Sequence, residues 1–65
     1  MTPIAIRALR RRLGLSQEGF ARRLGVSFAT VNRWENGRTA PWGIARHALR
    51  RLDSTTTQTD NPTGG

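Results

Sequence analysis

Apolar residues recur at helical spacing along most of the chain, in four short segments separated by glycine, asparagine or proline. In the first segment, Ile6, Leu9 and Leu13 lie at positions i, i+3 and i+7, which places them on one face of a helix. Thr2 can accept a hydrogen bond from the backbone at the start of such a helix. The pattern therefore predicts a first helix from Pro3 to Leu13.

The next two segments carry matching start and stop signals. Ser16 and Ser27 can each cap a helix, Gly25 can end the first of these helices, and Asn36-Gly37 is a turn signal after the second. Two short helices joined by a three-residue turn form a helix-turn-helix. Helical spacing predicts that their inward-facing residues are Phe20, Ala21, Leu24, Val31 and Trp34.

The last apolar segment is predicted to be a helix that begins at Pro41 and runs to about Leu52. Residues 53–65 contain no apolar side chain that could anchor them, so they are expected to form a disordered polar tail. The sequence thus predicts a small all-α, four-helix domain over residues 1–52. The core side of its last helix is expected to carry Ile44, Ala45, Ala48, Leu49 and Leu52.

Charge narrows the class of partner. The chain carries 11 basic residues, all of them arginine, against 4 acids, for a net charge of +7. Guanidinium groups suit bidentate contacts with phosphates and guanine edges, although the coding bias of a GC-rich genome would also remove lysine. The charge favours a nucleic acid first and an anionic membrane second. A membrane-surface peptide would gather its arginines on one long amphipathic helix, whereas here they are spread over four short ones.

Several other classes are not expected. The chain has no cysteine and one histidine, so neither a disulfide nor a structural metal site is predicted. It has no apolar run of the ~20 residues that span a bilayer and no signal peptide, so a cytoplasmic location is expected. The acids and His47 show no spacing typical of catalysis, so no enzyme activity, cofactor or small-molecule substrate is predicted.

Several sequence motifs resemble the phage repressor/Cro-like (XRE-type) helix-turn-helix family. They are L-G-L-S-Q at residues 13–17, F-A at 20–21, L-G-V-S at 24–27 and W-E-N-G-R at 34–38, followed by Pro41. The resemblance covers roughly residues 4–52. It implies an all-α domain that binds double-stranded DNA, with residues 27–35 as the recognition helix in the major groove. Many members have a fifth helix that supports dimerisation, and this helix is missing here.

The resemblance also implies roles for individual residues. Gln17, Ser27, Thr30 and Arg38 match positions that bind DNA phosphates. The base-reading positions of the recognition helix are Phe28, Ala29, Asn32 and Arg33. Arg33 is expected to contact guanine and Asn32 to contact adenine or a phosphate, while Phe28 and Ala29 are expected to pack on thymine methyl groups.

Arg10 and Glu35 match a buried ion pair found in some relatives, which would tie the first helix to the end of the third. For Phe28, a partly buried position at the start of the recognition helix is the alternative to a DNA contact. For Trp42, the core, a small dimer contact and the DNA backbone all stay open.

The function predicted from the sequence is a sequence-specific DNA-binding transcriptional regulator, most simply a repressor. The alternative is a DNA-binding or partner-binding module of an antitoxin or a larger regulatory complex. The missing fifth helix favours this alternative. A weak homodimer and a protein partner are both compatible with the sequence.

Overall fold

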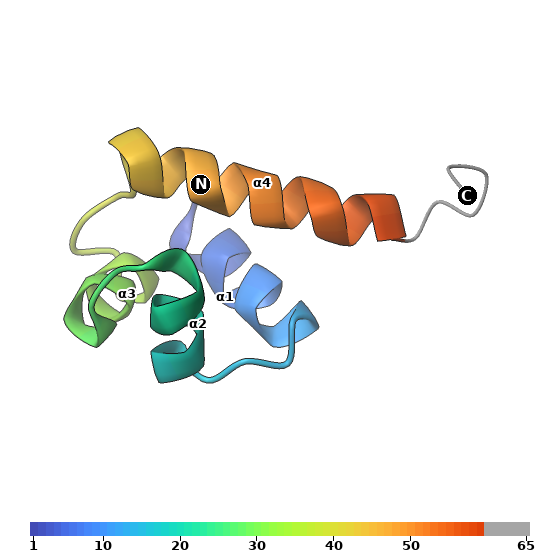
Figure 1. Ribbon diagram of the computed structural model, residues 1–65. Helices are drawn as coiled ribbons and strands as arrows, with labels where there is room; N and C mark the ends of the chain where they lie inside the picture. Colours follow the sequence, from blue (N-terminus) through green and yellow to red (C-terminus); the bar gives the residue numbers. More distant parts are fainter. Residues whose placement is uncertain (60–65) are drawn as a thin grey trace.

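Four helices make up the part of the chain that the structure describes, in agreement with the all-α fold predicted from the sequence. The structure is a computed structural model that describes residues 1–59, with side chains to residue 55. Figure 1 shows that α4 lies across a layer formed by the three shorter helices. The elements are α1 (Pro3–Arg12), α2 (Gln17–Leu24), α3 (Phe28–Glu35) and α4 (Gly43–Thr59).

Side-chain caps set the starts of the three shorter helices, at the residues that the sequence indicates. The Oγ1 atom of Thr2 accepts a hydrogen bond from the Ala5 amide at 3.1 Å. The hydroxyls of Ser16 and Ser27 accept equivalent bonds, each from the amide three residues later, at 3.0 and 3.1 Å. Each cap satisfies an amide that has no partner inside its helix, so these short helices begin at defined residues.

The turn between α2 and α3 depends on Gly25. This residue has φ +76°, a left-handed conformation that a side chain would strain. The chain reverses there, and the Val26 amide donates to the Ala21 carbonyl at 3.0 Å. Three residues therefore separate the end of α2 from the start of α3, and the axis of α3 points in a new direction.

The core lies between the three-helix layer and α4. Trp34 is only 3% exposed, which confirms that it is a core residue. Leu13, Leu15, Leu24 and Val26 pack around the edge of the core, where they cover the loops between helices. The buried hydrophobic residues are Ile6, Leu9, Phe20, Ala21, Val31, Trp34 and Leu49.

The start of α4 differs from the prediction. Pro41 is buried but is not helical, and the helix begins at Gly43. Gly43 has φ +62°, so the chain turns sharply into α4 at a residue without a side chain. Trp42 lies immediately before this turn and is 83% exposed, which removes the core from its possible environments.

The end of α4 also differs, because the helix continues past Leu52 to Thr59. The prediction that residues 53–59 belong to a disordered tail is therefore wrong. The Asp53 carboxylate accepts a hydrogen bond from the Arg12 guanidinium at 2.6 Å, and Leu52 packs on the core. No glycine or proline lies between Gly43 and Pro62 to end the helix. The rest of the predicted tail, residues 60–65, lies outside the described residues.

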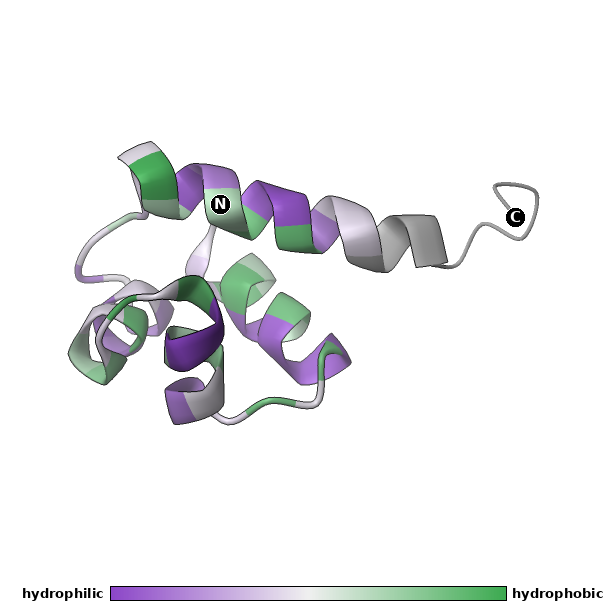
Figure 2. Ribbon diagram, in the orientation of Figure 1, coloured by the Kyte–Doolittle hydropathy of each residue, from purple (hydrophilic) through white to green (hydrophobic). Residues whose placement is uncertain are grey.

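Ile44 was expected in the core, but it is 88% exposed. Ala45, Leu49 and Leu52 form the stripe that packs on the core, at i, i+4 and i+7. Ile44 lies one residue, or about 100°, away from this stripe, in the first turn of the helix. In Figure 2 this first turn is coloured as hydrophobic, and hydrophobic and hydrophilic segments alternate along the rest of α4.

Residues 1–59 contain no fifth helix, and α4 is the longest of the four helices described. None of the described helices is both long and apolar enough to cross a bilayer.

The two faces of α4 should respond differently to truncation. We expect Leu49→Ala to lower the free energy of unfolding by about 2–5 kcal/mol, because it removes a buried side chain and leaves a cavity. Ile44→Ala should change it by less than about 0.5 kcal/mol, because the side chain is in water. Urea unfolding followed by circular dichroism measures both values. Equal losses for the two variants would contradict this assignment of the core face.

Candidate nucleic-acid interface

α3 presents two chemically different faces. Val31 and Trp34 point into the core and are buried. The residues expected to read bases begin with Phe28, which is 49% exposed, and Ala29 and Arg33 are exposed beside it. The core therefore fixes the helix along one side and leaves the opposite side open to solvent.

Asn32 is more enclosed than the other expected base-reading residues. It is half-buried, and its Nδ2 atom donates to Gln17 Oε1 at 3.3 Å. Its Oδ1 atom accepts a hydrogen bond from Asn36 Nδ2 at 2.9 Å. Asn32 thus links the open face of α3 to the start of α2 and to the end of its own helix.

Ser27 and Thr30 form a compact cap at the start of α3. In addition to the amide bond described above, their hydroxyl oxygens lie 2.8 Å apart. Ser27 is exposed and Thr30 is half-buried, so both polar groups lie at the rim of the open face. Because the free amides in the first turn of a helix attract anions, the start of α3 is suited to bind an anion.

Arg10 and Glu35 form a bidentate ion pair between α1 and α3. The Nε atom of Arg10 donates to Glu35 Oε2 at 2.7 Å, and its Nη2 atom donates to Oε1 at 3.1 Å. The Glu35 side chain is 1% exposed. Such a pair adds little net stability relative to an apolar pair, but a lone buried charge would be costly.

Two further bonds extend this pair. Arg10 also donates to the Leu15 carbonyl at 3.0 Å, which ties down the loop between α1 and α2. Arg7 donates to the Glu35 carbonyl at 3.2 Å, and its Nε atom lies 3.6 Å from the Glu35 carboxylate. Arg7 was not singled out in the sequence, although it lies one helical turn before Arg10 and therefore on the same side of α1.

Gln17 joins the ion pair to the reading face. Its Nε2 atom donates to Glu35 Oε1 at 3.0 Å, while its Oε1 atom accepts the bond from Asn32. The result is a continuous chain of side chains from α1 through the start of α2 to the exposed side of α3. Its members are Arg10, Glu35, Gln17, Asn32 and Asn36.

The network also determines the ionisation of Glu35. Burial alone would raise the pKa of this carboxyl group. Hydrogen bonds from Arg10 and Gln17 and the positive charges of Arg10 and Arg7 outweigh burial, so the pKa lies below its usual range. The hydrogen bond to Glu35 correspondingly raises the pKa of Arg10, against a smaller opposing effect of desolvation.

Arg38 is exposed in the loop after α3, and its amide donates to the Arg33 carbonyl at 2.9 Å. A depression of about 360 Å³ lies beside this loop and is lined in part by Thr30, Arg33 and Trp42. The expected phosphate-binding residue Arg38 thus lies at the end of α3 opposite to Ser27.

Among the described residues, no group of histidine, cysteine or acidic side chains could hold a metal ion.

These features define a helix-turn-helix DNA-binding domain: a capped two-helix unit, a basic chain and one open face on the second helix of the unit. A family model described as helix-turn-helix matches residues 6–41, more than half of the chain. The chain belongs to this family, the phage repressor/Cro-like (XRE-type) helix-turn-helix proteins. No curated protein and no solved structure was found to match the chain.

We expect Glu35→Gln to lower the free energy of unfolding at pH 7 by about 3 kcal/mol, because it leaves the Arg10 charge without its partner. The folded-state pKa of Glu35 is lowered, so its contribution is fully present above the unfolded value of about 4.3. It is lost as the pH falls through the folded pKa. The difference between wild type and variant in urea unfolding should therefore shrink in acid.

Asp53→Asn is the matched control, because its ion pair with Arg12 is exposed at both side chains. This variant should cost about 0–1 kcal/mol at pH 7. A Glu35→Gln cost that is no larger than the Asp53→Asn cost would show that the network is not a structural anchor.

Proposed function

We propose that the protein is a sequence-specific regulator of transcription that inserts α3 into the major groove of double-stranded DNA. The observation that carries the proposal is the side-chain network from Glu35 through Gln17 to Asn32. It holds the start of α2, a phosphate-binding element in this family, against the open face of α3. One rigid surface therefore offers both phosphate-binding and base-reading groups.

The reading face is assigned from exposure and chemistry. Arg33 is exposed and can donate two hydrogen bonds to a guanine edge. Phe28 and Ala29 are exposed apolar groups that can pack on thymine methyl groups. Asn32 keeps one amide hydrogen beyond its bond to Gln17, and this hydrogen can reach a base or a phosphate.

Phosphate contacts would position the reading face. Gln17 likewise keeps one amide hydrogen beyond its bond to Glu35, next to the free amides at the start of α2. Ser27 and Thr30 lie at the start of α3, and Arg38 lies beyond its end. Neutralisation of several phosphates by arginine would supply much of the affinity, which should fall steeply with salt.

The proposed setting is the cytoplasm, where the protein acts on the nucleoid, most simply as a repressor. Residues 1–52 form its DNA-binding domain, and the rest of α4 supports this domain. A weak homodimer would prefer half-sites about one helical turn apart. The alternative is a DNA-binding module of an antitoxin or larger complex. One observation favours it: the described chain extends α4 to Thr59 instead of forming a fifth helix, and Ser54 and Thr55 in this extension are exposed.

The test is selection of bound sequences from a pool of random duplexes, followed by a salt titration of the selected duplex and a scrambled duplex. We expect both affinities to fall linearly in log–log form, with the selected duplex bound at least about 10³-fold more tightly. Equal affinities at every salt concentration would overturn the claim of sequence specificity.

Arg33→Ala and Arg38→Ala should separate reading from positioning. Arg33→Ala should cost about 1–3 kcal/mol on the selected duplex and relax the preference at one base pair. Arg38→Ala should weaken binding to selected and scrambled duplexes alike and reduce the salt slope by about 1. Fluorescence anisotropy with single-base-pair substitutions in the duplex measures both effects. The assignment fails if the two variants give the same change in base preference.

A further inference from the structure

α4 has a solvent-facing side next to the stripe that packs on the core. Its side chains there recur at i, i+4 and i+7, the spacing of one helix face, and Leu52 at the edge of the core stripe adjoins them. They line a groove of about 390 Å³ between α4 and the end of α2, two helices that lie next to each other in Figure 1. The groove is lined by Ile44, His47, Ala48, Arg51, Leu52 and Thr55 of α4 together with Arg23 and Leu24 of α2.

The floor of this α2–α4 groove is apolar and its rim is cationic. Ala48, Leu52 and Leu24 are half-buried, and Ile44 projects from the first turn of α4 with most of its surface in water. Arg23 and Arg51 are exposed on the two sides. No acidic residue lines the groove. A ligand that matches it must combine apolar side chains with carboxylates.

We propose that the α2–α4 groove binds an acidic amphipathic helix of another protein. The lining residues of α4 extend from Ile44 to Thr55, which is about three helical turns or roughly 17 Å. A partner helix of about 12–15 residues would match this length. Its apolar stripe covers Ile44, Ala48 and Leu24, and its flanking carboxylates pair with Arg23 and Arg51.

Charge argues against a second copy of this chain as the occupant. The chain has a net charge of +7 and only four acids. Glu35 is buried against Arg10, and Asp53 is bonded to Arg12. Glu18 lies in the first turn of α2, at the far end of that helix from the groove, and Asp60 lies outside the described residues. A second copy would therefore bring arginines against arginines.

DNA is a polyanion as well, but the groove is separate from the proposed DNA interface. None of its lining residues belongs to α3 or to the expected phosphate-binding set. Arg23 lies six residues after Gln17, or about 9 Å further along α2. DNA also offers no apolar stripe to cover Ile44. The partner helix and the duplex can thus occupy the domain together.

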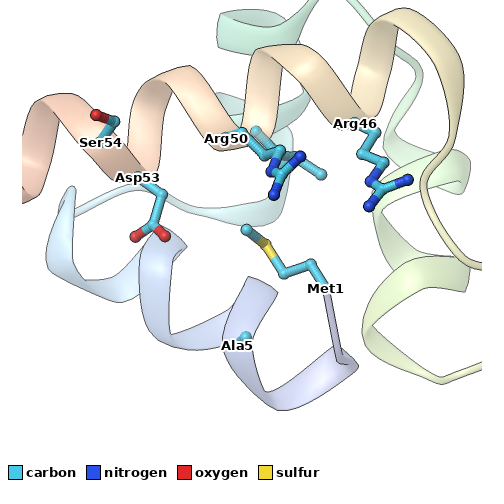
Figure 3. Close-up of a pocket in the computed structure, with 7 residues that line it drawn as sticks. Met1, Ala5, Arg46, Arg50, Asp53 and Ser54 are labelled. Carbon is cyan, nitrogen blue, oxygen red and sulfur yellow. The ribbon is translucent and has the colours of Figure 1, made fainter.

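A second depression on α4 lacks this uniform charge. It has a volume of about 420 Å³ and lies on the α1 side of the helix, where Arg46 and Arg50 reach toward Met1 (Figure 3). Asp53 is part of its lining, so an acid of the chain itself already faces these arginines. The α2–α4 groove carries the inference because no acid among the described residues lines it beside its cations.

The test uses the full chain labelled with ¹⁵N and a synthetic 15-residue peptide with leucine at i, i+3, i+4, i+7 and i+11 and glutamate at the flanking positions. A second peptide carries glutamine in place of every glutamate. We expect the acidic peptide to shift amide resonances at the end of α2 and along α4 from Ile44 to Thr55. The glutamine peptide should bind at least about fivefold more weakly, because it cannot pair with the rim.

Matched variants locate the site. Ile44→Gln should weaken the acidic peptide about tenfold, whereas Ile4→Gln should not, although Ile4 is also 78% exposed. Arg51→Gln should weaken it more than Arg11→Gln, which removes the same charge from an exposed site on α1. None of these residues belongs to the proposed DNA interface, so DNA binding by the Ile44 and Ile4 variants should match wild type.

Three results would overturn the inference. They are no resonance shifts with the acidic peptide, shifts centred on α3, and equal effects of the Ile44 and Ile4 variants. If a 20-base-pair duplex shifts the groove resonances and displaces the peptide, the groove is part of the DNA interface instead. The peptide measurement needs no DNA, so its failure leaves the proposed regulatory function to its own test.

Discussion

The buried carboxylate of Glu35 is the constraint on which the arrangement of the domain depends. A buried charge must be compensated, and here side chains from two other helices compensate the carboxylate at the end of α3. Arg10 binds it from α1, and Gln17 binds it from the start of α2. Because the partners come from α1 and α2 while Glu35 lies on α3, the bonds to this one group constrain how the three helices are placed relative to one another. Apolar packing among small side chains would tolerate several placements; the directional bonds to Glu35 select among them.

The same constraint links stability to DNA recognition. Gln17 and Asn32 are structural members of the network, and each keeps one amide hydrogen for a ligand. With eight residues, α3 is too short to be a stable helix alone, so its orientation depends on what it packs against. The side chains of Gln17 and Asn32 lose their conformational entropy on folding, before any ligand binds. The proposed DNA-binding surface is then already arranged before a duplex arrives, and such pre-organisation lowers the entropy lost on binding.

Local signals in the sequence predict the first three helices well. Serine and threonine caps and the left-handed Gly25 act within a few residues, so their effect is readable from the sequence. The errors fall on α4. Beyond Leu52 it includes Asp53, which contacts Arg12 41 residues away in the sequence, and its first turn begins at Gly43 rather than at Pro41. Helical spacing also cannot tell the core stripe from its neighbour, so Ile44 was placed on the wrong side. In the interface, the exposure of Phe28 and Arg33 follows from periodicity, whereas the bonds that hold Gln17 and Asn32 depend on how three helices meet.

The contrasting environments of the two tryptophans give the protein an internal optical reporter. Trp34 is enclosed in the core, while Trp42 stands in water at the entrance to α4. The indole emission of Trp34 moves to longer wavelength when the core unfolds. The emission of Trp42 already lies at the longer wavelength that is typical of an indole in water. Unfolding therefore changes one signal, and any molecule that settles near the loop between α3 and α4 changes the other.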